Sequence, residues 1–408
     1  MYDLLAGMRV VEAAAFIAGP SCGLHLAQMG AEVIRIDQIG GGPDFRRWPR
    51  APEDGASLYW EGLNKAKKSV ALDLTRPEGR ELAARVATGP GENAGLFVTN
   101  FPAEGFLSYE RLRTRRSDLI CVRVMGWPDG RPAVDYTVNC AVGVPLMTGP
   151  EDNPAPVNHV LPAWDLLAGA YAAFALVAAE RARRATGEGR EVRIPLSDLA
   201  IASLGHLGQI GEVATTGRDR PRMGNDLFGA FGRDFVTADG RRLMVVAITP
   251  RQWTGLVMVL GLGECVAALE TELGVSFSRD EGTRFEHRHR LAPLVEGAIA
   301  ARGFAELTAA FEAQGVTWGP YQSLKQAVDG DRYFNAANPL LREIDHPSGW
   351  RYLTPGSAAT LPASERQTPV AAPALGRDTD EVLAEVLGLT NSEIAALHDC
   401  GLAAGVQG

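Results

Sequence analysis

The residue best suited to chemistry is an acid at the start of an apolar helix. In the segment 158–165, NHVLPAWD, Pro162 marks the helix start, so Asp165 falls in the first turn. The helix carries no charge until Glu180 and reads as apolar on all sides, so we expect it to be buried. Its N-terminus should then hold the Asp165 carboxylate ionised among apolar neighbours, as suits a covalent nucleophile. The plainer alternative is an acid that only caps the helix.

A second pattern, Gly19-x-Ser21-x-Gly23, has the spacing of a hydrolase nucleophile elbow. Such an elbow follows several strands, whereas only 18 residues precede Gly19, and we therefore reject Ser21 as a nucleophile. We expect instead a tight strand-to-helix turn. The helix N-terminus there offers backbone N–H groups to an anion or an oxyanion.

Basic residues gather near this region. Only four lysines occur among the 40 basic residues of the chain, and three of them fall within four positions, at 65, 67 and 68. Compact ammonium groups suit phosphate as point charges. A polyanionic cofactor could therefore bind these lysines together with Arg35, Arg46 and Arg47. A solvated basic turn is the alternative.

The elements that must position these residues alternate between strand and helix. Apolar, β-leaning runs cover 8–14, 31–36, 69–74, 96–98, 119–124 and 192–195, with helical segments between them. This order predicts an α/β fold with a doubly wound, mostly parallel sheet over 1–220. A hairpin over 231–247 and helical segments over 250–314 predict a smaller α+β domain at 225–335. Two short helices close the chain.

The composition is that of a globular, enzyme-sized chain of 408 residues with a net charge of −9. This acidic balance argues against nucleic acid as a partner. The longest uncharged apolar run, 166–179, is shorter than the ~18–20 residues that cross a bilayer, and we expect neither a membrane span nor a secretory signal. Five scattered cysteines without a C-x-x-C pair favour a reduced cytoplasm. His287 and His289 lack a third ligand nearby, so we expect no metal site.

Short motifs along nearly the whole chain resemble those of the class III coenzyme A transferases. They are LLAGMRV (4–10), AGP (18–20), GAEVIR (30–35), NKAKKSVALDL (64–74), TNF (99–101), DLLAG (165–169), RARRATGEG (181–189) and LGRDTD (375–380). Four further stretches are similar to members that move CoA between the two carboxyl groups of mesaconyl-CoA. These are IGGG (39–42), NHVLPAWD (158–165), DRPRMGN (219–225) and GAFGRDF (229–235).

The resemblance implies that Asp165 accepts the acyl group, forming an aspartyl anhydride and then an enzyme–CoA thioester. CoA would be part of the substrate, with no prosthetic group. The CoA site would be lined by Ala18, Lys67, Asn100 and Phe101. Arg35 is a further candidate for this site because of its charge. The free carboxylate of the substrate needs a cation or donors, and the candidates are Arg47, Asn158, His159 and Arg233; Ile17 is a further candidate for contact with the substrate.

The resemblance also implies a Rossmann-like large domain that includes the segment 340–408, and an interlocked homodimer. Two departures narrow the activity. The racemases of the family carry a histidine where this chain has Val134, so abstraction of an α-proton loses its base. The formyl-CoA transferases carry a glutamine where this chain has Ile17, which argues against oxalate and formate as substrates. Two alternatives stay open: an intermolecular transferase that acts on a dicarboxylic acid, and a non-catalytic acyl-CoA-binding protein.

Overall fold

The computed structural model describes residues 1–52 and 55–406, which fold into two units. Unit 1 comprises Met1–Val142, His159–Gly211 and Arg332–Gly408, and unit 2 comprises Gly143–Asn158 and Glu212–Asp331. The C-terminal segment thus belongs with the N-terminal one. The sequence-based range of 1–220 for the large domain also contains 143–158, which the contacts assign to unit 2.

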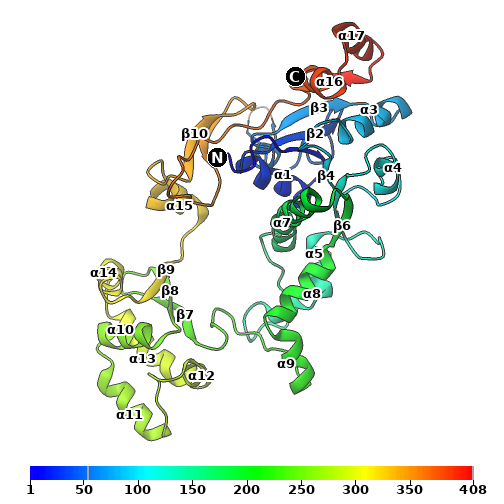
Figure 1. The fold of residues 1–408 in the computed structure, drawn as a ribbon. Helices are drawn as coiled ribbons and strands as arrows, with labels where there is room; N and C mark the ends of the chain where they lie inside the picture. Colours follow the sequence, from blue (N-terminus) through cyan, green and yellow to red (C-terminus); the bar gives the residue numbers. More distant parts are fainter. Residues whose placement is uncertain (53–54, 407–408) are drawn as a thin grey trace. The chain divides into compact units, whose positions relative to one another are not determined.

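Unit 1 is built on a seven-stranded sheet with the order β12-β3-β2-β1-β4-β5-β6 (Figure 1). All neighbouring strands are parallel except β12, which pairs antiparallel with β3. The chain runs outward from β1 to β3 and then continues on the other side of β1, which makes the sheet doubly wound with its switch point between β1 and β4. The predicted α/β fold class is confirmed. The strands are β1 Arg9–Ala13, β2 Glu32–Gln38, β3 Lys68–Leu72, β4 Leu96–Thr99, β5 Ile120–Met125, β6 Arg190–Pro195 and β12 Ala403–Ala404.

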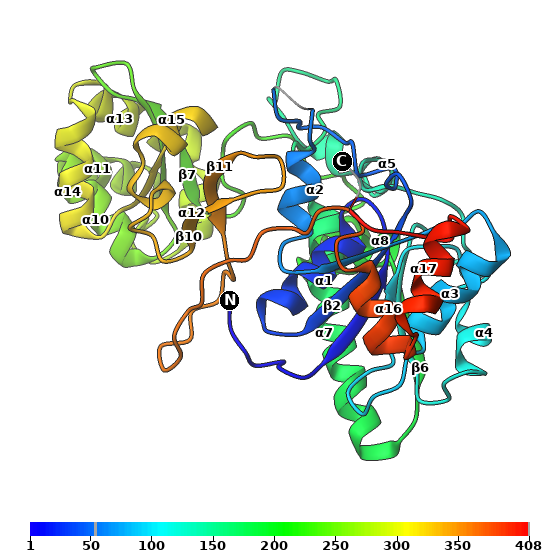
Figure 2. The same cartoon turned by 90° about the horizontal axis from the view of Figure 1, so that it is seen from above.

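Helices cover both faces of this sheet, because successive residues of the buried strands point to opposite faces. Val10 packs with the cluster under one set of helices and Val11 with the cluster under the other. The first set is α1 Ala18–Gln28, α5 Asp135–Ala141, α7 Ala163–Thr186 and α8 Leu196–His206. The second set, seen in Figure 2, is α3 Pro77–Ala87, α4 Tyr109–Arg113, α16 Thr379–Leu387 and α17 Asn391–Asp399.

The helix α7 corrects one prediction. Its residues Ala168, Ala172 and Leu176 are fully buried in the core of unit 1. The side chains of its opposite face are exposed, so the prediction that it is buried on all sides is wrong for the single chain; they are Leu166, Leu167, Tyr171 and Phe174. By length and composition α7 could also cross a membrane, but its packing on the sheet is that of a core helix.

Unit 2 contains an antiparallel sheet of the strands β7, β8 and β9. Helices pack on this sheet around a separate core that includes Phe231, Trp253 and Phe311. The elements are α6 Val144–Met147, β7 Phe231–Val236, β8 Arg242–Ala247, α10 Pro250–Leu260, α11 Gly263–Leu273, α12 Glu281–Glu286, α13 Arg288–Ala300, α14 Phe304–Gln314, β9 Thr317–Pro320 and α15 Leu324–Gly330. The predicted hairpin is present. The helix α9 Gln209–Thr216 spans the boundary between the units.

Besides the short 3-10 helix Arg332–Phe334, three described elements of unit 1 lie outside the layered core. They are α2 Leu58–Leu63 and the antiparallel hairpin of β10 Leu341–Asp345 and β11 Arg351–Pro355. The carboxylate of Glu61 on α2 accepts hydrogen bonds from Ser348 and from the Tyr352 hydroxyl of this hairpin. This hairpin was not predicted from the sequence, because its strands are short and half-exposed.

Candidate active site

The candidate site begins where β1 and β4 end, at the switch point of the sheet. In open α/β sheets ligands bind at this place, outside the carboxyl ends of the strands. Here the side chain of Asn100 joins the two strand ends: its Oδ1 accepts from Ala15 N at 3.1 Å and its Nδ2 donates to Ala15 O at 2.7 Å. The structure therefore brings the predicted residues Asn100 and Phe101 next to the loop that leads to Ala18.

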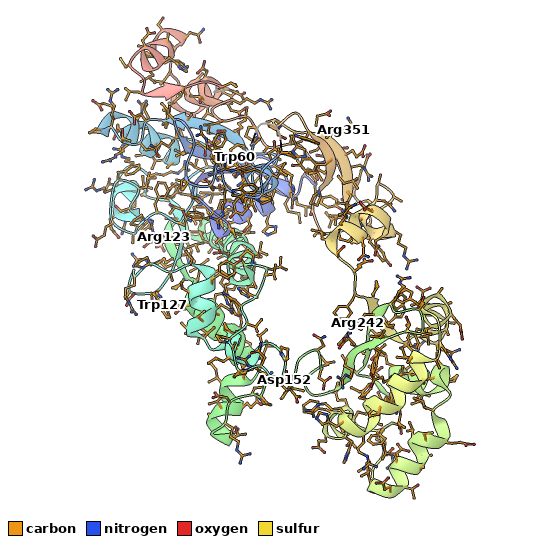
Figure 3. All side chains as sticks on the ribbon, turned by 180° about the vertical axis from the view of Figure 1, so that it is seen from behind. Trp60, Arg123, Trp127, Asp152, Arg242 and Arg351 are labelled. Carbon is orange, nitrogen blue, oxygen red and sulfur yellow. The ribbon has the colours of Figure 1, made fainter. Side chains whose placement is uncertain are left out.

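A fully buried arginine supports the segment that follows β4. Arg123 of β5, labelled in Figure 3, donates from Nη1 to the carbonyl oxygens of Phe101 at 2.7 Å and Pro102 at 3.0 Å. Its Nε pairs with Glu191 at 2.9 Å. Arg123 was not predicted from the sequence. An arginine inside an otherwise apolar strand, ICVRVM, was the signal that could have revealed it.

The turn between β1 and α1 is tight and partly strained. Phe16 has φ 67°, a left-handed conformation that costs a residue with a side chain about 1 kcal/mol or more. It is held there by a hydrogen bond from Phe16 N to Asp44 Oδ2 at 3.1 Å. Ile17 follows as the N-cap of α1, and Ala18 is the first helical residue. Strained residues of this kind gather at functional sites.

Close packing of α7 on α1 fixes the place of Asp165. A Cβ added to Gly169 would lie 1.8 Å from Ser21 Oγ and 2.9 Å from Ala18 O, so only glycine allows this approach. Asp165 stands one turn before Gly169 on the same face of α7. The spacing Asp165-x-x-x-Gly169 thus sets the acid near the start of α1.

The Asp165 carboxylate is half-buried, and its pKa is raised to about 6, first by burial and then by the negative charge of Asp135, while Arg47 opposes the shift. The expected stabilisation of the charged form by the helix N-terminus therefore does not prevail. No donor in the described part of the chain is within hydrogen-bonding distance of this carboxylate. Asp165 is therefore ionised at neutral pH, and its carboxylate accepts no hydrogen bond from the described residues.

Arg47 lies between two aromatic rings on the same side of the site. Its guanidinium carbon is 5.4 Å from the ring centre of Phe16 and 5.4 Å from that of Tyr59. Burial raises the pKa of Tyr59, and the charge of Asp165 adds to this effect. Arg47 and Tyr59 therefore face the acid, and the predicted residue Arg47 is brought to it. Tyr59 was missed by the sequence analysis.

His159 lies at the start of α7 on a second carboxylate. Its Nε2 is 2.5 Å from Asp135 Oδ1, and Asp135 Oδ2 accepts from Trp164 N at 2.7 Å and Asp165 N at 3.1 Å. Trp164 Nε1 donates to Asn139 Oδ1 at 3.1 Å. The carboxylate of Asp135 thus contacts both the ring of His159 and the backbone N–H of Asp165. Neither Asp135 nor Asn139 was predicted as a site residue from the sequence.

The predicted cations Arg35 and Lys67 are buried in a separate network around Glu12. Lys67 Nζ lies 2.9 Å from Glu12 Oε2 and donates to Asn64 Oδ1 and to Pro20 O. Arg35 pairs with Asp37, Glu12 and Asp44 at 2.7, 3.2 and 3.0 Å. Both charged groups are enclosed and fully paired, so direct contact with a phosphate does not follow from their positions. The network instead fixes Asp44, which holds Phe16.

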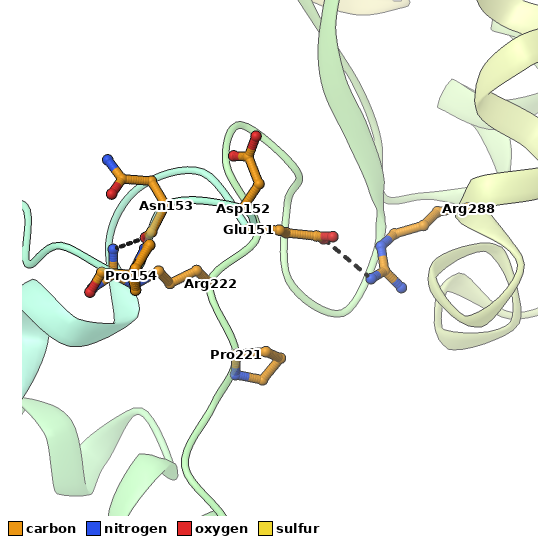
Figure 4. Close-up of a pocket in the computed structure, with 7 residues that line it drawn as sticks. All are labelled: Glu151, Asp152, Asn153, Pro154, Pro221, Arg222 and Arg288. Atoms are coloured by element: carbon orange, nitrogen blue, oxygen red, sulfur yellow. Dashed lines mark hydrogen bonds and ion pairs between the residues drawn. The ribbon is translucent and has the colours of Figure 1, made fainter.

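Two predicted substrate residues, Asn158 and Arg233, belong to unit 2, and the structure does not place them relative to Asp165. Arg233 Nε pairs with Asp226 Oδ1 at 3.3 Å. Unit 2 has an open pocket of its own (Figure 4), lined by Glu151, Asp152, Asn153, Pro154, Pro221, Arg222 and Arg288. None of the predicted site residues lines it. Arg222 there donates to the carbonyl oxygens of Leu146 and Asn153. The arginine of the motif DRPRMGN (219–225) therefore holds the neighbouring loop in place.

Comparison with known proteins decides the family. A model of CoA-transferase family III matches residues 5–379. The chain belongs to this family. It is 49% identical over 405 residues to 2-methylfumaryl-CoA isomerase of Chloroflexus aurantiacus, with 99% of each chain covered. It is 30% identical to succinyl-CoA–D-citramalate CoA-transferase of the same organism, with 97% of this chain and 96% of the relative covered. The family resemblance predicted from the sequence is confirmed.

The fold of this CoA-transferase family III member has solved counterparts. A CAIB/BAIF family protein from Brucella suis superposes with a TM-score of 0.75 at 24% identity, covering 95% of this chain and 100% of the other. Rv3272 from M. tuberculosis superposes with a TM-score of 0.72 at 24% identity, covering 92% and 97%. At this identity the likeness supports the fold alone.

Proposed function

We propose that this protein moves CoA between the two carboxyl groups of 2-methylfumaryl-CoA (mesaconyl-CoA) and yields 3-methylfumaryl-CoA. The observation that carries the proposal is the Asp165 carboxylate, half-buried and without a hydrogen-bond donor among the described residues, beside the start of α1 at the switch point. The substrate follows the relative that shares 49% of the sequence. CoA enters as part of the substrate.

In the first half of the reaction, an oxygen of Asp165 attacks the thioester carbonyl carbon and the CoA thiolate leaves. The product is a mixed anhydride between Asp165 and the acyl group. N–H groups of the first turn of α1, at Ala18 and Gly19, have no acceptor within the helix and are suited to the tetrahedral oxyanion. The thiolate then attacks the aspartyl carbonyl carbon, which releases the free dicarboxylate and leaves an Asp165–CoA thioester.

In the second half, the other carboxylate of the bound diacid attacks the Asp165–CoA thioester and expels the thiolate. The thiolate attacks the new acyl carbonyl carbon, which frees Asp165 and completes the product thioester. No water, proton or external acid is consumed. The diacid must stay bound throughout, which makes the second half effectively unimolecular.

Retention of the diacid requires a cation beside Asp165. Arg47 is suited because Phe16 and Tyr59 flank its guanidinium and leave it near the acid. His159 and Ile17 belong to unit 1 and Asn158 and Arg233 to unit 2, and all four stay predictions as substrate residues. Asn100, Phe101 and Ala18 would line the path of CoA, with Arg35 and Lys67 supporting the loop from inside.

The proposal is tested by giving the enzyme 2-methylfumaryl-CoA alone, labelled with ¹³C at the thioester carbon. We expect carbon NMR to show the label moving from thioester to carboxylate with no acid added. A transferase acting between molecules, as the name of the 30% relative suggests, would need a second acid and would leave the label in place. Binding without any label movement would indicate a non-catalytic acyl-CoA-binding protein.

We also propose that a second copy of the chain covers the exposed face of α7. Four large apolar side chains of one helix face solvent in the single chain: Leu166, Leu167, Tyr171 and Phe174. Exposed apolar patches of this kind mark interfaces. Light scattering should give the mass of a homodimer, and F174E should weaken it; a wild-type monomer would contradict the proposal.

The free thiols among the described residues fit the cytoplasmic location that we propose.

A further inference from the structure

The start of α7 has an unusual set of hydrogen bonds. A helix leaves its first N–H groups without partners inside the helix, and an acid at the third helical position commonly reaches back to the N-cap N–H. Here the N-cap is Pro162, which has no N–H, so Asp165 cannot close such a box. Ala163 N donates to Leu161 O at 2.8 Å, and Leu166 N makes the first bond within the helix.

The two N–H groups between them, of Trp164 and Asp165, both donate to the Oδ2 of Asp135. Asp135 comes from α5 and is 1% exposed, so the cap is supplied from outside the helix by a buried carboxylate. Its other oxygen is occupied by His159 at 2.5 Å. Every N–H group in the first turn of α7 that could have stabilised the Asp165 carboxylate therefore already donates to another acceptor.

We infer that Asp135, paired with His159, is a positioning residue for the reaction: it takes the N–H groups at the start of α7 and leaves the Asp165 carboxylate uncapped beside a like charge. The inference rests on the proposed role of Asp165 as nucleophile. Asp135 acts through the backbone of Asp165 and not on the reacting atoms. It fixes the backbone of Asp165 through one bond to its N–H and denies its side chain the stabilising bonds.

The chemical advantage lies in the basicity of the nucleophile. Carboxylates that accept two or three backbone N–H bonds are strongly stabilised as anions and attack poorly, whereas an unbonded carboxylate beside another negative charge is more basic. The groups that face Asp165 are Asp135 from α5, Arg47 from the loop after β2 and Tyr59 from α2. Of these, only Asp135 both raises the pKa of Asp165 by its charge and blocks the donors that would lower it.

The variant D135N separates charge from shape. The amide oxygen can still accept from Trp164 N and Asp165 N, and the amide nitrogen can face His159. We expect the acid limb of kcat/KM to move to lower pH by roughly one unit, with kcat lowered several-fold and KM little changed. The conservative variant H159Q keeps a donor for Asp135 and should retain the wild-type limb.

The control is T137A, which removes the side-chain bond that caps the same helix α5 at Val134 without changing any charge near Asp165. It should leave the acid limb in place. If D135N keeps the wild-type acid limb, or if T137A moves it equally, Asp135 is merely structural and the inference is overturned. Failure of the proposed function is distinguishable, because then D165N itself would retain activity.

Discussion

Two carboxylates of unit 1, those of Glu12 and Asp165, have opposite surroundings. Glu12 is completely enclosed, and its oxygens lie within 3.2 Å of both Lys67 and Arg35. Asp165 is only half-buried, yet it accepts no hydrogen bond within the described ranges 1–52 and 55–406, and its nearest influences are one like charge and one arginine. The carboxylate with more partners is Glu12, which has no role in the proposed reaction.

The difference shows how the fold distributes its charges. Buried ions are tolerated when they are paired, and breaking one partner of such a pair is costly. The Glu12 network meets this condition and ties β1, β2 and the loop before β3 together. Asp165 does not, and the fold holds it by packing at Gly169 and by Asp135 at its N–H. In unit 1 the paired carboxylate, Glu12, supports the fold, and the unpaired carboxylate, Asp165, is the one that we propose to react.

The largest effect should come from D165N, which keeps shape and removes the nucleophile. We expect kcat to fall by at least ~10³-fold. Stability should move the other way: the pKa of Asp165 is higher in the folded chain than in the unfolded one, so at neutral pH its charge costs stability. D165N should raise Tm at pH 7.5 by ~2 °C. Near pH 4 this gain should vanish, since the wild-type acid is then protonated in the folded chain. Calorimetry at both values checks the sign.

The variant E12Q should lose stability, whereas D165N should gain it. Loss of this charge leaves Lys67 and Arg35 partly unpaired in the interior, at a cost of ~3–5 kcal/mol in the free energy of unfolding, measured with urea. The matched control is E32Q. Glu32 also contacts two cations, Arg9 and Lys68, both at 2.8 Å, but all three side chains are about a quarter to a third exposed, so its loss should cost under ~1 kcal/mol. Equal costs for the two variants would remove the contrast between them.

The smallest effect is the dependence of the wild-type rate on pH. Because the carboxylate must be ionised to attack, kcat/KM should be flat above pH 7 and fall about tenfold per pH unit below about 6. An acid limb near the ordinary value of an aspartate would show that burial and Asp135 do not act on Asp165 as described. Circular dichroism over the same range would separate this limb from unfolding.

The sequence predicted the sheet well, because its strands are buried apolar runs and its turns carry glycine. Asp165 was also predictable, since Pro162 fixed its place in the helix. The environment of Asp165 was not. The sequence suggested that α7 would stabilise the charge, whereas Asp135, 30 residues away in the sequence, takes the N–H groups that would have done so.

Charge patterning did not reveal the partners of the lysines. The three clustered lysines predict a phosphate site, which stays a prediction, and the structure shows Lys67 buried against Glu12, a residue far away in the sequence. Lys65 is also buried, and burial lowers its pKa to about 8. Such pairings depend on the register of parallel strands, which local patterns do not contain. The exposed face of α7 could not be predicted either, because an apolar sequence does not say whether its own chain covers it.

The central claim is that the oxygen of Asp165 carries the migrating group, and covalent trapping tests it most directly. The enzyme is mixed with 2-methylfumaryl-CoA and hydroxylamine, and the peptide that contains Asp165 is analysed by tandem mass spectrometry. The account predicts a hydroxamate at Asp165, formed only when the acyl-CoA is present and absent in D165N. Continued turnover with an unmodified Asp165, or a hydroxamate on another residue, would contradict it.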